Sequence, residues 1–432
     1  MFFNIGGKNG IVKLLNSSLT RVTSALFYLF LRLIIFEMPK VLRIINRFNL
    51  GGPTYNAAYL TKYLPEEYET LLIGGDKEDT EDSSQHILNE LGINPIIIPE
   101  MRRAIRFGND YAAYKKIKQI IEEFKPDIVH THASKAGTLG RMAAFSCKVP
   151  AVVHTFHGHV FHSYFSKTKT RIFKRIEKKL AEKSSAIVAI SNIQKQELGS
   201  IHKIADLDKI EVIPLGFDLD RFQQNLDKKR AVFRTEYQIE DDEIAIGIIG
   251  RLVPIKNHKL FLQALKKVLG STNKKVRAFI VGDGESRDQI ISLAEELGIQ
   301  YSRSNLAFEK TPLTFTSWIK NIDVVNAGMD IIALSSLNEG TPVSLIEAQA
   351  ANNPIVSTNV GGIENVVIQN KTGLLSEMED VESYAENLLE LIENDSKRIA
   401  MQKEGWNHVK DQFSYNRLVS DVDKLYKKIL NK

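Results

Sequence analysis

The sequence predicts an α/β protein built from two doubly wound domains, each with a parallel β-sheet between layers of helices. Its 432 residues exceed what one hydrophobic core usually holds, so two domains of roughly 200 residues are expected. From Lys40 onward, short apolar runs alternate with longer stretches of helical periodicity, which is the pattern of βαβ units. The alternation restarts near residue 244, and this restart predicts a second sheet.

Seven apolar runs supply the strands expected in the first sheet. They cover residues 41–46, 70–75, 95–99, 127–132, 151–156, 186–191 and 211–215. Helical periodicities lie between them, for example over residues 110–124. Because a helix between consecutive strands returns the chain to the same end of the sheet, the strands are expected to run parallel.

Four further runs supply strands of the second sheet. They cover residues 244–251, 277–284, 330–336 and 354–360. A turn and a charged helical segment at 213–230 separate the two sets, and we interpret this segment as the hinge. A last helical stretch, 416–431, has no strand of its own to cover. Two doubly wound domains that face each other place the loops at the carboxyl ends of their strands around a shared cleft, which is the expected ligand site.

Composition narrows the partners and the compartment. The net charge of +5 is small for this length, and no basic tract carries interleaved aromatic residues, so nucleic acid is not expected as a partner. Cys147 is the only cysteine, which excludes an intrachain disulfide and fits a reducing, cytoplasmic compartment. One cysteine and scattered histidines give no zinc-ligand spacing, so no metal site is predicted.

The N-terminal part carries an apolar run at 22–36 that Arg32 interrupts. A spanning helix needs about 20 apolar residues, so the run is short for crossing a bilayer. The region before it is long and no small-residue cleavage site follows, which disfavours a secretory signal. Two alternatives stay open, a helix on a membrane surface and a helix packed on the protein. A third is that Met38 is the true start, because the α/β pattern begins there.

The stretch SSLNEGTPVSLIEA, residues 335–348, predicts a helix start that binds an anion. Gly340 gives the loop backbone freedom, Thr341 can act as N-cap, and Pro342 fits the first helical position. The amides of Val343, Ser344 and Leu345 would then be free at the end of the helix where the macrodipole favours a phosphate.

Two glutamates flank this helix start. Glu347 lies four residues beyond Val343, on the same helix face and one turn deeper. Glu339 lies in the loop before the helix. A carboxylate beside a diphosphate can accept paired hydrogen bonds from vicinal hydroxyls, so the two acids are expected to bind hydroxyl-rich groups on either side of the phosphates. The alternative is a capped helix with two solvated acids.

Arg251 and Lys256, in GRLVPIK, supply cations after a predicted strand of the second sheet. A planar guanidinium and a mobile ammonium form a suitable clamp for a diphosphate whose charge must be stabilised as it departs. Two ordinary surface cations are the alternative.

The first half contributes a glycine-rich turn and a histidine cluster. Gly51 and Gly52 permit close approach of backbone to a ligand, but the turn is not GxGxxG, which disfavours a nicotinamide enzyme. In VHTFHGHVFH, His157 best matches a loop residue aimed into the cleft, and the neighbouring histidines lack a carboxylate with metal-ligand spacing. Asp218 and Asp220 form a D-x-D that we expect to cap the linker helix rather than to hold a metal.

Together these motifs resemble those of the retaining glycosyltransferases of the GT-B fold, in the large family-4, or group 1, type. The resemblance runs from about Met38 to the end. It rests on NEGTPVSLIEA, which is similar to the family's E-G-x-P-x(4)-E motif, and on GRLVPIK, VVHTFHG, FIVGDGE and PIVSTNVGG. Residues 130–144, HTHASKAGTLGRMAA, also resemble members that act in bacterial polysaccharide and glycolipid assembly.

The resemblance implies a role for each site residue. Arg251 and Lys256 are expected to clamp the donor diphosphate, and Glu347 is expected to bind the ribose. Glu339 and residues 340–344 are expected to hold the donor sugar and its phosphates. His157 corresponds to the active-site histidine, and Gly52 lies in the flexible first loop. Residues 302–308 lack the F-x-G that the family usually carries near the nucleobase, so the base stays open.

The resemblance also implies the domain boundaries. Residues 1–37 form an extension, 38–215 with the terminal helix 414–432 form a Rossmann-like acceptor-side domain, and 216–413 form the nucleotide-sugar-binding domain. The terminal helix is expected to cross back onto the first domain.

The implied activity moves a hexosyl or N-acetylhexosaminyl group from a nucleotide sugar to a saccharide or lipid-linked saccharide. The donor is expected to be UDP-linked. The transfer is expected to retain configuration and to need neither a metal nor another cofactor. Two alternatives are a UDP-sugar epimerase of the same fold and a non-enzymatic nucleotide-sugar-binding subunit of an assembly complex. The first would interconvert UDP-sugars without releasing UDP, and the second would bind UDP without turnover.

Residues 166–185 carry eight Lys or Arg against two Glu, with an apolar stripe at helical spacing made of Ile172, Phe173, Ile176 and Leu180. The stripe and its cations can rest on anionic lipid at the cytoplasmic face of the inner membrane. A solvated helix whose stripe faces the core is the alternative.

Overall fold

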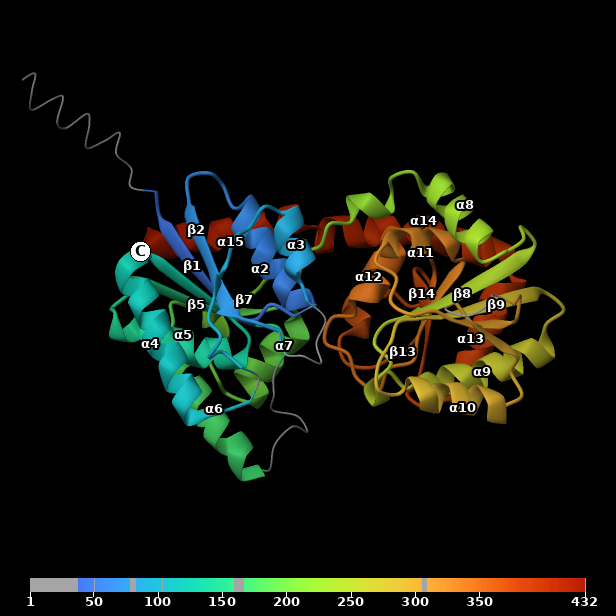
Figure 1. Cartoon of the computed structure of the whole chain (residues 1–432), viewed down its shortest axis with the longest axis horizontal. Helices are drawn as coiled ribbons and strands as arrows, with labels where there is room; N and C mark the ends of the chain where they lie inside the picture. Colours follow the sequence, from blue (N-terminus) through green and yellow to red (C-terminus); the bar gives the residue numbers. More distant parts are fainter. Residues whose placement is uncertain are drawn as a thin grey trace, which may run out of the picture.

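The computed structural model describes residues 38–49, 51–77, 83–102, 104–158, 167–304 and 309–431, with backbone alone at 167–169. Figure 1 shows two α/β bodies side by side, each built around a sheet. The apolar run at 22–36, His159 and His162, and part of the segment 302–308 lie outside the described residues.

The first body is a seven-stranded parallel sheet in the order β3-β2-β1-β4-β5-β6-β7. Its strands are β1 (Lys40–Arg47), β2 (Glu69–Gly75), β3 (Ile96–Ile97), β4 (Ile128–His132), β5 (Ala151–Phe156), β6 (Ala186–Ala189) and β7 (Ile210–Val212). Each corresponds to one of the seven predicted apolar runs. The strand order reverses between β1 and β4, and such a switch point opens a crevice at the carboxyl ends of the strands.

Helices cover both faces of the first sheet because successive side chains of a strand point to opposite sides. On one face, Val41 joins a cluster with α2 (Gly52–Tyr63) and α15 (Tyr415–Leu430). On the other, Leu42 joins a cluster with α4 (Phe107–Phe124) and α5 (Ser134–Ser146). The remaining α-helices of this body are α3 (Gln85–Glu90), α6 (Lys167–Lys183) and α7 (Asn192–Gln196).

The second body is also a seven-stranded parallel sheet, in the order β10-β11-β9-β8-β12-β13-β14. Its strands are β8 (Glu243–Ile249), β9 (Lys275–Val281), β10 (Tyr301–Arg303), β11 (Leu313–Phe315), β12 (Ile331–Leu334), β13 (Ile355–Thr358) and β14 (Gly373–Ser376). The strands β10, β11 and β14 were not among the four predicted runs. Two parallel sheets with helices on both faces confirm the predicted fold class.

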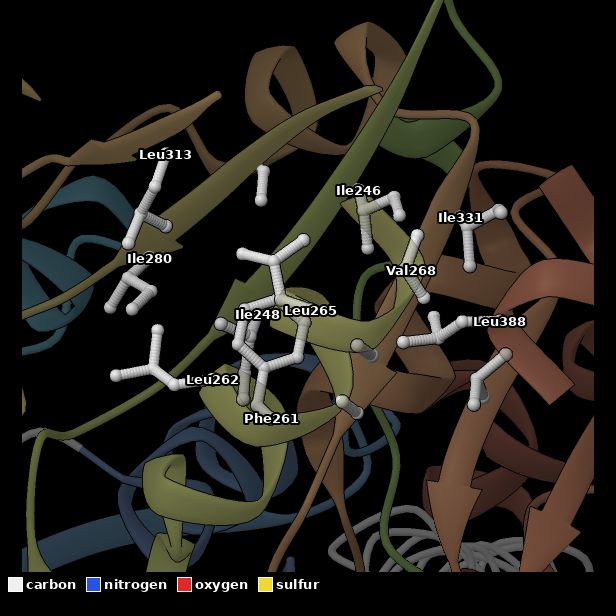
Figure 2. Packing of buried hydrophobic residues seen from close by; sticks show 14 of the residues in the cluster. Ile246, Ile248, Phe261, Leu262, Leu265, Val268, Ile280, Leu313, Ile331 and Leu388 are labelled. Atoms are coloured by element: carbon white, nitrogen blue, oxygen red, sulfur yellow. The ribbon is translucent and has the colours of Figure 1, made fainter. Parts of the chain in front are cut away.

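Helices again cover both faces of the second sheet. One face packs on α9 (His258–Ser271), α10 (Arg287–Glu296) and α13 (Val381–Glu393). Figure 2 shows this packing, in which Ile246 and Ile248 of β8 lie beside Leu265 of α9 and Leu388 belongs to α13. The other face packs on α8 (Leu226–Glu236), α11 (Ile322–Gly328), α12 (Val343–Ala350) and α14 (Asp395–Phe413). In the described part of the chain, no helix combines the length and the apolar character needed to cross a bilayer.

The chain passes between the two bodies twice, and the two passages are hydrogen-bonded to each other. The amide of Phe217 donates to the carbonyl of Phe413 at 2.8 Å, and the amide of Tyr415 donates to the carbonyl of Phe217 at 3.0 Å. Gly216 lies under the start of α15, where a Cβ would come within 2.6 Å of Leu418. A side chain at this position would therefore push the terminal helix away from the hinge.

The helix α15 closes the first body, as the resemblance implied. Its buried face, which includes Leu418, Val422 and Tyr426, packs in the cluster under the first sheet. Arg417 ties its first turn to the hinge by donating to the carbonyls of Pro214 and Leu215 at 2.9 and 2.7 Å. In Figure 1 this helix lies in the first body, while α14, which precedes it in sequence, lies in the second.

We expect Arg417→Ala to lower the free energy of unfolding by about 1–3 kcal/mol, because two partly buried carbonyls lose a charged donor. Lys424→Ala on the same helix removes an exposed ion pair with Asp421 and should change stability by less than about 0.5 kcal/mol. Urea unfolding measures both variants. Equal effects of the two substitutions would contradict the anchoring role of Arg417.

Candidate functional site

The loop that follows β8 is joined to the loop that follows β9. The amide of Leu252 donates to the carbonyl of Asp283 at 2.9 Å, and the amide of Ser286 donates to the carbonyl of Leu252 at 2.8 Å. Gly284 has a positive φ, and a Cβ there would overlap the carbonyl of Leu252. Gly284, the second glycine of FIVGDGE, is therefore needed for these two loops to approach each other.

The same β8 loop is also joined to the loop that follows β12. The amide of Leu337 donates to the carbonyl of Ile255 at 2.8 Å. The hydroxyl of Ser335 donates to the carbonyl of Lys256 at 2.9 Å. These bonds bring the GRLVPIK segment against the segment that contains Glu339.

The glycine pair of PIVSTNVGG supports the other side of the Glu339 loop. The amide of Gly362 donates to the carbonyl of Glu339 at 2.9 Å. A Cβ on Gly361, which has φ of +56°, would overlap that carbonyl, and a Cβ on Gly362 would overlap the carbonyl of Gly340. The loops after β8, β12 and β13 therefore converge on Glu339 and Gly340.

Lys256 and Glu339, two of the residues singled out by sequence, are in direct contact. The Nζ of Lys256 lies 2.5 Å from Oε1 of Glu339, and the hydroxyl of Ser336 donates to the same oxygen at 2.6 Å. The side chains are 19% and 11% exposed, so the pair is largely sheltered from water. An ammonium has three donors, so Lys256 can hold Glu339 and still offer donors to a ligand. Arg251, at the beginning of the same loop, is exposed.

The helix after Glu339 starts one residue later than the sequence predicts. Val343 is its first residue and Pro342 is its N-cap, so Thr341 is not the cap and Pro342 is not the first helical residue. No side chain caps this helix start. The first bond into the helix runs from the amide of Leu345 to the carbonyl of Pro342 at 3.1 Å. The amides of Val343 and Ser344 precede that bond, whereas the amide of Leu345, also expected to be free, donates to Pro342.

Glu347 lies on this helix with its side chain 19% exposed. Burial raises the pKa of Glu347 to about 7, while the charge of Arg221 lowers it and the charge of Asp323 raises it further. The Nη2 of Arg221 lies 3.9 Å from Oε1 of Glu347. Sequence reasoning did not assign a role to Arg221, because its partner is more than a hundred positions away and no local motif connects them.

The glycine-rich turn of the first body lies against the start of α12. A Cβ on Gly52 would lie 3.8 Å from Cγ2 of Val343 and 3.7 Å from Cδ1 of Leu215. Gly51 directly precedes α2 as its N-cap. The amide group of Asn56 ties this turn to the hinge, donating to the carbonyls of Gly52 at 3.1 Å and Gly216 at 3.4 Å. The structure therefore brings the first-body glycines next to the helix start of the second body.

His157 lies one residue beyond β5, at the carboxyl end of the first sheet. Its Nε2 is 2.9 Å from Nδ1 of His132. Burial lowers the pKa of His157 to about 4, so its imidazole is neutral at pH 7. His154 is not part of this pair, since it is hydrogen-bonded to Thr131 on the opposite face of the sheet. Sequence reasoning missed His132, although the alternation H-T-H in a buried strand places His130 and His132 on one face.

The D-x-D pair does not cap the linker helix as expected. Asp218 accepts hydrogen bonds from the backbone of Asp220 and Arg221, in the 3₁₀ turn Asp220–Phe222, whose N-cap position is Leu219. The helix α8 instead has Asn225 as N-cap, without a side-chain hydrogen bond. Among the described residues, no group of three or more His, Cys, Asp or Glu side chains is arranged to hold a metal ion.

Two family descriptions match the two bodies separately. Residues 50–221 match the family described as Glycosyltransferase Family 4, and residues 229–408 match the family described as Glycosyl transferases group 1.

Bacterial glycosyltransferases are among the relatives. The chain is 30% identical to the UDP-Gal:alpha-D-GlcNAc-diphosphoundecaprenol alpha-1,3-galactosyltransferase of Escherichia coli, over 77% of this chain and 84% of that protein. It is 25% identical to the capsular polysaccharide biosynthesis glycosyltransferase CapM of Staphylococcus aureus, over 77% of this chain and 85% of that protein.

Solved structures share the fold at low identity. HepE of Anabaena in complex with UDP superposes with a TM-score of 0.74 at 18% identity, over 90% of this chain and all of that one. WaaG, a glycosyltransferase involved in lipopolysaccharide biosynthesis, superposes with a TM-score of 0.68 at 16% identity, over 89% and 99% of the two chains. These likenesses confirm the two-domain fold.

We expect Glu347→Gln to be more stable than the wild type at pH 8, by about 3 kcal/mol, and similarly stable at pH 4. The folded-state pKa of about 7 lies above the ordinary value of 4.5, so between these values the folded state holds a proton that the unfolded state has lost. The free energy of unfolding of the wild type therefore falls, relative to the variant, as pH rises from about 4.5 to 7, and the difference is constant above that.

Urea unfolding of both proteins across this pH range measures the difference. Glu386→Gln, at an exposed position on α13, serves as the matched control. A stability difference between wild type and Glu347→Gln that does not change with pH would contradict the raised pKa.

Proposed function

The chain belongs to the group 1 glycosyltransferases, and on that premise we propose that it transfers a hexosyl or N-acetylhexosaminyl group from a UDP-sugar to a saccharide or lipid-linked saccharide acceptor, with retention of configuration. The observation that carries this proposal is the convergence of Lys256, Glu339 and the uncapped start of α12 at one edge of the second sheet. A cation, a carboxylate and free amides in one place suit a ligand that is both anionic and rich in hydroxyls.

The diphosphate of the donor would bind at the start of α12. The amides of Val343 and Ser344 offer donors there, and the macrodipole adds a partial positive charge. Arg251 and Lys256 supply full charges from the loop after β8. The same groups stabilise the nucleoside diphosphate as it departs, when its negative charge grows.

The two glutamates then bind the parts of the donor on either side of the diphosphate. Glu347, one turn into α12, would accept hydrogen bonds from the ribose hydroxyls. Glu339, fixed by Lys256 and Ser336, would accept hydrogen bonds from hydroxyls of the transferred sugar. Because Lys256 contacts Glu339 and carries further donors, it can join the sugar site to the phosphate site.

Two observations on related proteins support UDP as the donor's nucleotide. The E. coli relative is named for a UDP-Gal donor, and HepE has been solved with UDP and with UDP-glucose. The strand β10 ends at Arg303, within the segment 302–308 that lacks the F-x-G motif. No residue of this segment is therefore assigned to contact the base. The choice of UDP therefore depends on the relatives.

Retention follows if the acceptor hydroxyl attacks the anomeric carbon from the side on which the diphosphate leaves. In that step the bond from the anomeric carbon to the phosphate oxygen breaks, the bond to the acceptor oxygen forms, and the acceptor proton passes to the departing phosphate oxygen. Arg251 and Lys256 provide the positive charge that this departure requires, so we propose that the reaction needs no metal ion. His157, a neutral imidazole, would hydrogen-bond to the sugar and orient it.

The acceptor is proposed to be presented at an anionic membrane surface, at the cytoplasmic face of the inner membrane. In α6, Leu180 of the apolar stripe is buried, but Ile172 and Ile176 are 51% and 37% exposed. Arg175 and Lys179 are exposed at neighbouring positions of the same helix face. Exposed apolar side chains beside cations favour contact with anionic lipid, and the E. coli relative is named for a diphosphoundecaprenol-linked acceptor.

We expect Lys256→Ala and Glu339→Ala to lower the rate of sugar transfer by at least about 10²-fold, because each removes a charged group from the donor site. Release of nucleoside diphosphate is measured against UDP-sugars first and GDP-mannose second, with polysaccharide and lipid-linked acceptors. Lys259→Ala, at an exposed position on α9, is the matched control and should leave the rate unchanged.

The same assay with EDTA tests metal independence, and the expected result is an unchanged rate. Full turnover by the Lys256→Ala and Glu339→Ala variants would contradict the site assignment. Conversion of a UDP-sugar without release of UDP would instead identify an epimerase.

We expect Arg175→Gln combined with Lys179→Gln to weaken binding to vesicles that contain anionic lipid by about 10- to 30-fold, at roughly 1 kcal/mol per charge. Co-sedimentation measures the binding. Lys259→Gln combined with Lys266→Gln, exposed on α9 of the second body, removes the same charge and should bind as the wild type does. Equal loss in the two double variants would argue against a specific α6 surface.

A further inference from the structure

Beneath α15, the first sheet carries polar side chains on three neighbouring strands. Arg43 of β1 is paired with His130 of β4, and His132 of β4 is paired with Thr155 of β5. Paired residues of parallel neighbours point to the same face, and residues two apart on a strand do as well. His157, two positions after Thr155, continues the same row toward the cleft.

This row is buried and begins at Arg43, a cation that has no carboxylate partner among the described residues. Arg43, His130 and His132 are no more than 1% exposed. The guanidinium of Arg43 reaches the hydroxyl of Tyr426 on α15 at 3.5 Å, and burial lowers its pKa. A cation among imidazoles disfavours further protons, and the pKa values of His130 and His132 lie well below the ordinary value because both rings are buried. The imidazoles are therefore neutral.

Neutral imidazoles and a guanidinium fix the direction of the hydrogen bonds. Arg43 can only donate, so Tyr426 accepts from it and gives its own proton to Nδ1 of His130, at 2.6 Å. His130 then carries its proton on Nε2 and donates it to the hydroxyl of Thr155, at 2.7 Å. The hydroxyl proton of Thr155 must in turn find an acceptor.

A water molecule between Thr155 and the ring of His132 can supply that acceptor. His132 stacks on His130 with ring centroids 4.4 Å apart. Its Nε2 is buried and has no hydrogen-bond partner among the described residues. Thr155, His132 and His157 line one cavity of about 10 Å³, which has room for about one water molecule. A water there would accept from Thr155 and donate to Nε2 of His132, which leaves the His132 proton on Nδ1.

His132 and His157 share one proton. Their rings lie with centroids 5.2 Å apart, and Nδ1 of His132 is 2.9 Å from Nε2 of His157. If His132 donates, His157 must carry its own proton on Nδ1, and Nδ1 has no partner among the described residues. Sugar hydroxyls and phosphate oxygens accept hydrogen bonds, so this tautomer suits a ligand of the proposed chemistry.

We propose that His132 is a positioning residue that donates from Nδ1 to Nε2 of His157 and thereby fixes the ring orientation and the tautomer of His157. This inference rests on the proposed role of His157 in orienting the donor sugar. The row from Arg43 through Tyr426, His130 and Thr155 determines which nitrogen of His132 carries the proton. The terminal helix α15 thus takes part in the site through Tyr426.

The test compares two substitutions of His132. Asparagine places an amide close to the position of Nδ1 and can still donate to His157, whereas phenylalanine keeps a flat ring and cannot. We expect His132→Phe to lower kcat by about 10²-fold with KM for the donor nearly unchanged, since a misplaced group affects the reaction more than binding. His132→Asn should retain most of the activity.

Thermal unfolding separates positioning from packing. Phenylalanine is apolar and fits a buried site, so His132→Phe is expected to unfold at or above the temperature of His132→Asn. A loss of kcat that follows the loss of stability in both variants would overturn the proposal, as would full activity of His132→Phe.

Histidine ¹⁵N NMR of the ligand-free protein gives a readout independent of transfer. The His157 resonances, assigned by their loss in His157→Gln, should show a protonated Nδ1 and an unprotonated Nε2, and His132→Phe should change that ratio. The opposite tautomer in the wild type, or no change in the variant, would overturn the proposal. A fully active His157→Gln would refute the proposed role of His157 in transfer while leaving the NMR result intact, so the two failures can be told apart.

Discussion

The site depends on the hydrogen-bonded double passage of the chain between its two bodies. A single connection would leave the bodies free to reorient, but Phe217 is bonded to both Phe413 and Tyr415, so the hinge and the return passage form one unit. Gly216 permits α15 to start directly against the hinge, and Asn56 joins the first glycine-rich turn to the same residue. The hinge at Gly216 and Phe217 therefore holds the turn after β1 near the start of α12, which follows β12.

The first sheet shows how a buried polar row can be tolerated. At the amino ends of its central strands the face under α15 is apolar, with Val41 and Ile128, whereas toward the cleft the same face carries Arg43, His130 and His132. Burying a guanidinium without a carboxylate is costly, and Tyr426 offsets only part of that cost. The row is consistent with a functional constraint, because apolar residues at these positions would serve stability better.

The sequence predicted most of the fold, and its failures have physical causes. The eleven predicted runs all became strands because strands buried on both faces are nearly continuous apolar runs. The strands β10, β11 and β14, with the sequences YSR, LTF and GLLS, were missed because polar residues or glycine make up part of each, so no continuous apolar run marks them. The start of α12 was misplaced by one residue because Pro342 fits either the N-cap or the first helical position.

Within the site, local motifs were found and long-range pairs were not. Glu339 and Lys256 were identified separately, each from its own motif, but their contact depends on how the loops after β8 and β12 approach each other. Arg221 was seen only as a neighbour of a D-x-D, and its position beside Glu347 is set by the hinge. The H-T-H alternation of the predicted strand 127–132 places His132 on the same face as His130. The prediction nevertheless chose His157, because histidines are more numerous in the segment around the following strand.

The electrostatics of Glu347 connect these features to ligand binding. In the ligand-free protein its carboxyl group is desolvated, and Arg221 at 3.9 Å compensates only partly, so the pKa rises to about 7. Ribose hydroxyls that donate to the carboxylate would favour its charged form and lower that pKa. In the proposed function, the donor would therefore bind with release of part of a proton near neutral pH, and binding would weaken as pH falls below 7. The same burial that opposes the charged form in the free protein would make its hydrogen bonds to a bound ribose stronger than they would be in water.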